Sequence, residues 1–367
     1  MKIDSIRIVR VKMPLKYPFR TSFANIDLIG SVLVEVTSGG MSGWGEASAL
    51  SRPEYSGEWS AGQFMASRDF IAPLLINKDI KSGTQLQSLL YGLKGNYFAK
   101  AAFDLAWWDL HAKQQGQPLW KMLGGIHTPI DAGADFGVMD SIEDLIGAMK
   151  EAEEQGYKRV KLKYRPGWDL DMVKEVRNEF PHMPVHIDCN SCYTLNDLPM
   201  FRELDKYNLT MIEQPLANDD LIDHARLQTE LKTAICLDES IVSADKVRKA
   251  IQIGACRFVN IKLGRVGGIT NALEIIRICE EYNIPCWVGG MLESAVGQSH
   301  NVAFATLPNI KYPSDIFPTS RFYEKDLGKP EMNHSGSSQF MPSPSPGIGV
   351  IPDEEFLKQV IIEECIL

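Results

Sequence analysis

The sequence lacks the features that would place the chain in a membrane or on a nucleic acid. No apolar run reaches the roughly 18 residues that a bilayer-spanning helix needs. The first 19 residues alternate apolar and polar types and lack the apolar core of a signal peptide. Basic residues are in deficit, because 38 Lys and Arg face 47 Asp and Glu, a formal net charge of −9. An acidic chain has no basic field for phosphates, so we expect neither a membrane nor a nucleic-acid partner.

The cysteines do not form the pattern of a disulfide framework. There are seven of them, an odd number, spread over 367 residues. This is typical of reduced thiols in the cytosol, and we expect a cytoplasmic protein. The pair Cys189 and Cys192 has no second pair with which to build a zinc site. We therefore assign that pair to packing.

Length and composition indicate a globular chain with a large core. At 44% hydrophobic and 23% charged residues the sequence is not that of a disordered protein. Its length fits two domains, or one large barrel with additions. We expect a first domain over 1–125, β-rich and then helical, and a second over 126–318. The segment 319–367, which ends in a predicted helix at 353–361, should pack back on the first domain.

A structural period runs through the middle of the chain. Short β-branched runs, each ending in a polar residue, alternate with helical stretches. The polar residues at the ends of five successive runs are Lys163, Asp188, Glu213, Asp238 and Lys262. Their spacings are 25, 25, 25 and 24 residues, about one strand plus one helix. With further runs at 130–136, 285–290 and 309–315, the pattern predicts an α/β protein with an eight-stranded parallel (β/α) barrel.

Three of these residues predict a metal site. Barrel active sites lie at the C-terminal ends of the strands, and Asp188, Glu213 and Asp238 end three neighbouring strands. Three carboxylates that close together cannot all stay ionised without a cation. Oxygen ligands suit Mg²⁺, and Mn²⁺ nearly as well. The alternative, ordinary helix-capping acids, does not account for three at 25-residue steps.

The two lysines predict acid–base chemistry beside that metal. Lys163 and Lys262 end strands that lie opposite each other in an eight-stranded barrel. A lysine beside a cation in a dry cavity has a lowered pKa and can act as a base, and Lys161 would lower the pKa of Lys163 further. The alternative is a pair of surface lysines. The set as a whole predicts removal of a proton α to a substrate carboxylate, with stabilisation of the enediolate.

Several motifs in the chain also match a known family. They are Pro18-Phe19-Arg20-Thr21-Ser22-Phe23, Gly43-Trp44-Gly45-Glu46, Lys161-Leu162-Lys163, Asp188-Cys189-Asn190, Ile212-Glu213-Gln214-Pro215, Leu237-Asp238-Glu239-Ser240, Asn260-Ile261-Lys262, Gly264-Arg265-Val266-Gly267-Gly268 and Gly289-Gly290-Met291-Leu292-Glu293-Ser294. In this order and at barrel spacing, they resemble the muconate-lactonizing subgroup of the enolase superfamily. The nearest resemblance is to the o-succinylbenzoate synthase and N-acylamino acid racemase family.

The resemblance implies a fold and a set of site residues. The fold is a (β/α)7β barrel with an α+β capping domain, whose loops around 18–25 and 47–56 close over the mouth. Lys163 and Lys262 would be catalytic, and a small carboxylate the substrate of a homo-oligomeric enzyme. Residues implied near the substrate or behind the ligands are Phe19, Phe23, Leu50, Tyr55, Lys161, Asn190, Glu239, Arg265, Met291, Leu292 and Glu293. For each of the four capping residues among them, packing inside the cap is the alternative.

One departure from the family pattern concerns the substrate. The first barrel strand reads Ala134-Asp135-Phe136, where related enzymes usually carry a small residue and then an aliphatic one. Asp135 would add a negative charge at the mouth and disfavour a second substrate carboxylate, such as a succinyl group, unless an arginine or water intervenes. Leu263 also stands where proline is common.

Several functions remain open at this point. The first is dehydration to o-succinylbenzoate in menaquinone synthesis, with Lys163 as base and then acid. The second is racemisation of an N-succinylamino acid, with Lys163 and Lys262 as bases on opposite faces. Another racemase, epimerase or dehydratase of the subgroup is a third alternative. Two alternatives lie outside this subgroup: a Schiff-base aldolase that uses Lys262, and a barrel without catalytic activity.

Overall fold

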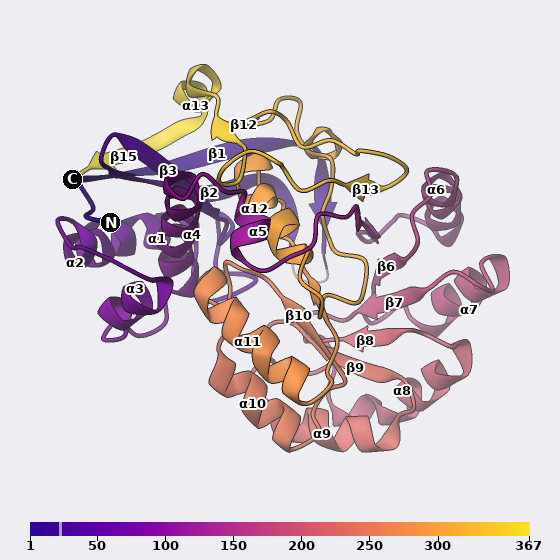
Figure 1. Ribbon diagram of the computed structural model, residues 1–367. Coiled ribbons are helices and arrows are strands. Elements are labelled where there is room, and N and C mark those ends of the chain that lie inside the picture. Colours follow the sequence, from indigo (N-terminus) through magenta and orange to yellow (C-terminus); the bar gives the residue numbers. More distant parts are fainter. Residues whose placement is uncertain (22–23) are drawn as a thin grey trace.

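The computed structural model describes residues 1–21 and 24–367, and it contains an antiparallel sheet beside a parallel barrel (Figure 1). The antiparallel sheet has the strand order β15-β1-β2-β3. Its strands are β1 (Ser5–Arg20), β2 (Asn25–Ser38), β3 (Met41–Ala47) and β15 (Ile361–Ile366). Because β15 pairs with β1, the end of the chain completes the N-terminal sheet. The two termini therefore lie close together in Figure 1.

Helices cover this sheet and connect it to the barrel. They are α1 (Ser60–Ala66), α2 (Ala72–Leu75), α3 (Gly83–Leu90), α4 (Tyr97–Gln114) and α5 (Leu119–Met122), with a π-helical turn at Ser67–Ile71. Helix α4 packs tightly on β3 because β3 carries two glycines there. A Cβ on Gly43 would lie 2.3 Å from the carbonyl oxygen of Ala106, and one on Gly45 would lie 2.1 Å from that of Ala102. The glycines of this motif thus permit a close helix–sheet contact.

The barrel contains seven parallel strands in the order of the sequence. They are β5 (Ala134–Phe136), β6 (Val160–Lys163), β7 (Val185–Asp188), β8 (Met211–Glu213), β9 (Ala234–Leu237), β10 (Phe258–Ile261) and β11 (Cys286–Val288). The predicted (β/α)7β barrel with its α+β capping domain is confirmed. Figure 1 shows the barrel helices on the outside of these strands.

Those helices alternate with the strands. They are α6 (Ile142–Glu154), α7 (Leu170–Glu179), α8 (Leu198–Leu204), α9 (Leu221–Glu230), α10 (Ala244–Gln252), α11 (Ile269–Glu281) and α12 (Ala295–Ala305). The side chains of Ser141, Ser243 and Ser294 accept backbone hydrogen bonds at the starts of α6, α10 and α12. None of the helices in the described part of the chain is long and apolar enough to cross a bilayer.

Two predicted strands are shorter or less regular than the sequence suggested. The run 130–136 is divided at Gly133 into β4 (Ile130–Asp131), which pairs with β13 (Gln339–Phe340), and the barrel strand β5. A Cβ on Gly133 would lie 1.8 Å from the side chain of Arg159, so this break makes room for a buried arginine. The run 309–315 forms only isolated parallel bridges to Cys286 and Ala132. Pro313 within it has no N–H for a continuous ladder.

The tail runs from the barrel back to the capping sheet. Its short elements are β12 (Gly328–Lys329), β14 (Ile351–Pro352) and α13 (Glu354–Val360), and α13 agrees with the helix predicted at 353–361.

A buried acid also links the capping domain to the barrel. The Glu46 carboxylate, at the end of β3, accepts hydrogen bonds from Ser31 Oγ at 2.9 Å and from the Gly297 N–H of α12 at 3.0 Å. The cap is thereby held against the barrel.

Candidate active site

The five polar residues that end successive runs lie at one end of the barrel. Lys163, Asp188 and Glu213 are the last residues of β6, β7 and β8, and Asp238 and Lys262 directly follow β9 and β10. The parallel register sets Lys163 beside Asp188 and Asp188 beside Glu213. All five side chains are buried. The strand order therefore places three carboxylates between two lysines.

Lys161 is the centre of a buried ion-pair network. Its Nζ lies 3.1 Å from Asp188 Oδ2 and 3.2 Å from Glu213 Oε2. It also donates a hydrogen bond to Asp315 Oδ2 at 3.1 Å. Burial lowers the pKa of Lys161, but the Asp188 carboxylate and its other acidic neighbours raise it by more. Lys161 is therefore a charged group that neutralises several acids.

Lys163 is held by Asp188 and Asn190. Its Nζ donates to Asp188 Oδ2 at 2.7 Å and to Asn190 Oδ1 at 3.0 Å, and Asn190 Nδ2 donates to Glu239 Oε1 at 3.0 Å. Burial lowers the pKa of Lys163, whereas the Asp188 carboxylate raises it, and the net shift is upward. The lowered pKa was predicted for a lysine beside a bound cation, whereas in these contacts the nearest charge is a carboxylate. Asp188 carries the opposite shift: burial would raise its pKa, but Lys161 and Lys163 lower it by more.

Lys262 is held by Asp238 and by an aromatic ring of the cap. Its Nζ lies 3.1 Å from Asp238 Oδ2 and 4.3 Å from the centre of the Tyr55 ring. Burial lowers the pKa of Lys262, but Asp238 raises it by more, so the net shift is upward. Arg265 is also buried and pairs with Asp238. Its charge lowers the pKa of Lys262, but less than Asp238 raises it.

Tyr55 has a polar role that the sequence did not indicate. Its hydroxyl donates a hydrogen bond to Asp238 Oδ2 at 3.1 Å and accepts one from Arg265 Nη1 at 2.8 Å. The tyrosine belongs to the cap loop after β3, while the other two residues belong to the barrel. A side chain expected as part of an apolar wall therefore joins the cap directly to a predicted metal ligand.

The three carboxylates have the donor chemistry of a site for a hard divalent cation. Asp188, Glu213 and Asp238 offer only oxygen ligands, as Mg²⁺ prefers. Glu213 Oε2 is buried and accepts no hydrogen bond from a described residue. Its neighbours are Lys161 Nζ at 3.2 Å and His186 Nε2 at 3.3 Å, so its charge is balanced only by ion-pair contacts that a bound cation could replace. Burial and the neighbouring Asp188 raise the pKa of Glu213 to about 7.

The carboxylates of Asp188, Glu213 and Asp238 contact lysines and do not converge on one common point. Within residues 1–21 and 24–367, no three side chains of His, Cys, Asp or Glu are grouped closely enough to hold a metal ion. Asp188 pairs with Lys163, and Asp238 pairs with Lys262. The oxygen atoms of these residues therefore suit the predicted cation, but in the structure they form ion pairs with lysines.

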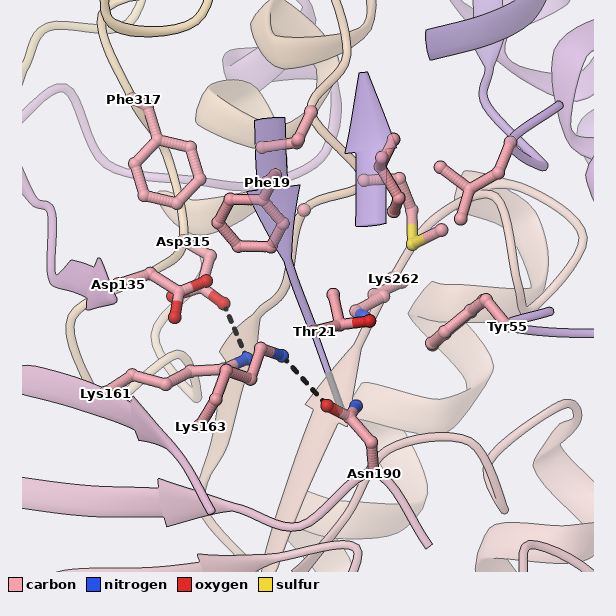
Figure 2. A pocket seen from close by; sticks show the side chains of 15 residues that line it. Phe19, Thr21, Tyr55, Asp135, Lys161, Lys163, Asn190, Lys262, Asp315 and Phe317 are labelled. Carbon is pink, nitrogen blue, oxygen red and sulfur yellow. Dashed lines mark hydrogen bonds and ion pairs between the residues drawn. The ribbon is translucent and has the colours of Figure 1, made fainter. Parts of the chain in front are cut away.

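A cavity lies between these lysines and the cap (Figure 2). Ten of the residues predicted near the substrate line it: Phe19, Leu50, Tyr55, Asp135, Lys161, Lys163, Asn190, Lys262, Met291 and Leu292. Figure 2 shows Lys161 and Lys163 extending from one side and Phe19 and Tyr55 from the cap. Phe23 lies outside the described residues.

The other predicted residues stand behind the cavity wall. Glu239 accepts the hydrogen bond from Asn190, and burial raises the pKa of Glu239 to about 8, with a further contribution from Asp238. Glu293 accepts a hydrogen bond from the Met291 N–H at 2.9 Å. These two acids therefore support the cavity wall.

Five lining residues were not predicted from the sequence: Thr21, Ile26, Gly290, Asp315 and Phe317. Asp315 is the most important of them because it is charged. Its Oδ1 pairs with the fully buried Arg159, and its Oδ2 accepts from Lys161. Asp315 ends the run 309–315 and so occupies the same position as the acids that were found, but that run was the least regular of the eight.

Two family models match the chain. One, described as the N-terminal domain of mandelate racemase and muconate lactonizing enzyme, matches residues 3–124. The other, described as enolase C-terminal domain-like, matches residues 144–356. The resemblance seen in the motifs is confirmed by both matches.

Relatives of known activity are similar over nearly the whole chain. An o-succinylbenzoate synthase from Geobacillus kaustophilus is 44% identical over 95% of this chain and 93% of its own length. An N-succinylamino acid racemase from Thermus thermophilus is 39% identical over 99% of this chain and 98% of its own length. A solved structure of an enolase-superfamily member from Listeria innocua has a TM-score of 0.96 at 36% identity, covering 100% of this chain and 99% of the other.

Proposed function

The chain belongs to the mandelate racemase and muconate lactonizing enzyme family of the enolase superfamily, and from this premise we propose that it removes a proton α to a substrate carboxylate. It is an enzyme related to o-succinylbenzoate synthases and N-succinylamino acid racemases, as the sequence predicted. We propose that its substrate is the precursor of o-succinylbenzoate, an N-succinylamino acid, or both. Both reactions begin with the same proton transfer.

One observation carries this proposal: the two lysines flank the three acids. Lys163 ends β6 and Lys262 follows β10, four strands away in the sheet. In a barrel with eight positions, this separation puts two groups on opposite sides of the mouth. Nζ groups on opposite sides can reach the two faces of one α carbon.

We propose that Asp188, Glu213 and Asp238 hold Mg²⁺, with Mn²⁺ as an alternative. When bound, the cation supplies positive charge that stabilises the negative charge developing on the substrate carboxylate. Buried carboxylates on three adjacent strands support this assignment. Asn190 and Glu239 would orient the end of β7 that carries Asp188. Asn190 accepts a hydrogen bond from Lys163, the partner of Asp188, and donates one to Glu239.

The lysine contacts bear on how a base would form. Burial lowers the pKa of Lys163 and Asp188 raises it. Once Asp188 serves as a ligand, its oxygen no longer stabilises the ammonium of Lys163 as strongly, and the effect of burial then dominates. We therefore expect Lys163 Nζ to lose its proton more readily in the loaded enzyme and to accept the α proton of the substrate.

The second lysine distinguishes the two reactions. In racemisation, Lys262 Nζ would deliver or remove a proton on the face opposite Lys163. In dehydration, Lys163 would act as base and then as acid on one face, and Lys262 would contribute only positive charge. Lys262 Nζ lies 3.1 Å from Asp238 Oδ2 and 4.3 Å from the centre of the Tyr55 ring. If Asp238 serves as a ligand, the contact with the ring remains, and it favours the charged form that the second role needs.

A Schiff-base aldolase is less well supported. Such an enzyme would use Lys262 as its covalent lysine, and it would have no use for three buried acids on the strands between the lysines.

Exchange of the α proton in D₂O tests the proposal. Purified enzyme with Mg²⁺ should exchange the α proton of N-succinylamino acids or convert the cyclohexadiene precursor to o-succinylbenzoate. Lys163→Ala should lower kcat by about 10³-fold or more, while Lys158→Ala, a change at an exposed lysine, should leave it unaltered. If Lys163→Ala keeps more than about a tenth of the wild-type kcat, Lys163 is not the base.

A further inference from the structure

Asp315 is held in place from behind by Arg159, which is fully buried. The guanidinium of Arg159 pairs with Asp315 Oδ1, and its Nε donates a hydrogen bond to the Pro313 carbonyl oxygen at 3.0 Å. The Asp315 N–H donates to the Val288 carbonyl oxygen of β11 at 2.8 Å. Because a guanidinium stays protonated, it keeps the carboxylate beside it charged. The barrel therefore fixes both the backbone and one carboxylate oxygen of Asp315.

The other oxygen of Asp315 binds Lys161 at the wall of the cavity. Lys161 Nζ donates a hydrogen bond to Asp315 Oδ2 at 3.1 Å (Figure 2). It also lies 3.1 Å from a carboxylate oxygen of Asp188 and 3.2 Å from one of Glu213. An ammonium has three N–H donors, so these three acids match its capacity. Two of them are proposed metal ligands, and Asp315 is the one that is not.

Loading of the metal site changes the surroundings of Lys161. An oxygen that coordinates a divalent cation stabilises an ammonium beside it less strongly, so the contacts with Asp188 and Glu213 should weaken. The cation and the ammonium of Lys163, on the same strand, would both repel Lys161. Its flexible four-carbon side chain would then turn away from the metal site unless another anion held it.

Asp135 is the other acid at this wall, and it is less suited to hold Lys161. It lines the cavity beside Lys161, but its Oδ1 accepts no hydrogen bond from a described residue. Burial raises the pKa of Asp135, and Lys161 and Lys163 lower it by less, so the net shift is upward. Asp135 therefore loses its charge more readily than Asp315, with which Arg159 pairs directly.

We propose that Asp315 is a positioning residue, which keeps the Lys161 ammonium beside the metal site after the cation has taken its other two partners. The N–H groups released by Asp188 and Glu213 would then face the cavity and donate to the substrate carboxylate. This inference rests on the proposed function, because it needs a loaded metal site. It also gives a task to the buried pair of Arg159 and Asp315, which the proposed reaction does not otherwise use.

A double-mutant cycle on Mg²⁺ affinity, measured by calorimetry without substrate, tests the coupling between Asp315 and Lys161. Asp315→Asn should weaken Mg²⁺ binding about tenfold, because the displaced ammonium then lacks its charged partner. Lys161→Gln removes the competing ammonium and should tighten Mg²⁺ binding. In the Lys161→Gln background, the factor caused by Asp315→Asn should be at least about threefold smaller than in the wild type, since only the loss of one negative charge remains.

Two controls accompany the cycle. Asp140→Asn removes one negative charge from an exposed acid that pairs with Arg20, and it should change Mg²⁺ affinity by less than about twofold because exposed charges are screened. Thermal unfolding checks that each variant folds, since Asp315→Asn leaves Arg159 buried without its charged partner. If that variant does not fold, Asp315→Asn combined with Arg159→Met removes both charges and replaces it in the cycle, with the same expected factors.

Equal factors for Asp315→Asn in the two backgrounds would overturn the inference, because the residue would then act independently of Lys161. Unchanged Mg²⁺ affinity in Asp315→Asn would overturn it as well. Exchange of the α proton by the wild type reports on the proposed function. Mg²⁺ binding and exchange without coupling contradict only this inference, coupling without exchange contradicts only the function, and a wild type that binds no Mg²⁺ contradicts both.

Discussion

Lys163 Nζ and Asp188 Oδ2, at the ends of neighbouring strands, lie 2.7 Å apart. The proposed base and a proposed metal ligand are thus paired with each other. One carboxylate oxygen cannot fully stabilise both an ammonium and a divalent cation, so loading the site should weaken this contact. The protonation state of the base is therefore linked to occupation of the metal site.

This link can be measured by chemical modification of Lys163. Because burial lowers its pKa and Asp188 raises it, Mg²⁺ bound at Asp188 should lower the pKa of Lys163. The reaction of Lys163 with an amine reagent, followed by mass spectrometry over a range of pH, should begin at lower pH when Mg²⁺ is present. The exposed Lys158 should show the same onset with and without Mg²⁺. An unchanged onset for Lys163 would contradict the link.

Removal of the metal should abolish activity. Excess EDTA is expected to stop α-proton exchange, and Mg²⁺ or Mn²⁺ should restore it, because both suit oxygen ligands. Asp188→Asn should weaken Mg²⁺ binding by at least tenfold in calorimetry, whereas Asp245→Asn, at an exposed acid on α10, should not. Activity that persists in excess EDTA would contradict the metal assignment.

The Tyr55 hydroxyl should matter more than its ring. Tyr55→Phe keeps the ring over Lys262 but removes a donor to Asp238 and an acceptor for Arg265. Leaving buried polar groups unpaired costs about 1–3 kcal/mol, so we expect kcat/KM to fall about tenfold and Mg²⁺ to bind more weakly. Tyr55→Leu should lower both further. If Tyr55→Phe behaves like wild type, the hydroxyl contacts do not support the site.

The contact between α4 and β3 can be tested by thermal unfolding. Gly45→Ala would put a Cβ 2.1 Å from the Ala102 carbonyl oxygen, and forcing these elements apart should cost about 1–3 kcal/mol of unfolding free energy. Gly147→Ala is the matched control in α6, where a Cβ meets nothing within 4 Å. Because alanine favours helix over glycine, this variant should gain up to about 1 kcal/mol. Equal effects would contradict the close contact.

The sequence predicted the strand ends well because the barrel repeats. A β-branched run followed by one polar residue, at steps of 24 or 25 residues, locates Lys163, Asp188, Glu213, Asp238 and Lys262. Side chains alternate along a strand, so Lys161, two residues before Lys163, points into the barrel as Lys163 does. The residues at these repeating positions could be predicted without knowing how the cap folds.

Contacts made outside the period were not predictable in this way. The ion pair of Arg159 with Asp315 joins residues 156 positions apart, and the second lies after a segment that forms isolated bridges instead of a strand. Tyr55 belongs to a cap loop whose path depends on the helices behind it. The direction of the lysine pKa shifts also depended on distances to carboxylates, which spacing along the chain does not reveal.

The role of Lys262 separates racemisation from dehydration. Lys262→Arg keeps a positive charge near Asp238 but replaces an amine with a guanidinium, which stays protonated. If the enzyme racemises with two bases, the variant should still exchange the α proton of the enantiomer that faces Lys163, yet fail to invert it. For dehydration, Lys262 needs only its charge, so the variant should keep part of its activity if the longer side chain fits beside Tyr55. The measurement is α-proton exchange by NMR on both enantiomers, beside a dehydration assay. Equal loss of exchange for both enantiomers, in a variant that still binds Mg²⁺ and substrate, would break the two-base assignment, because Lys163 alone should serve one face.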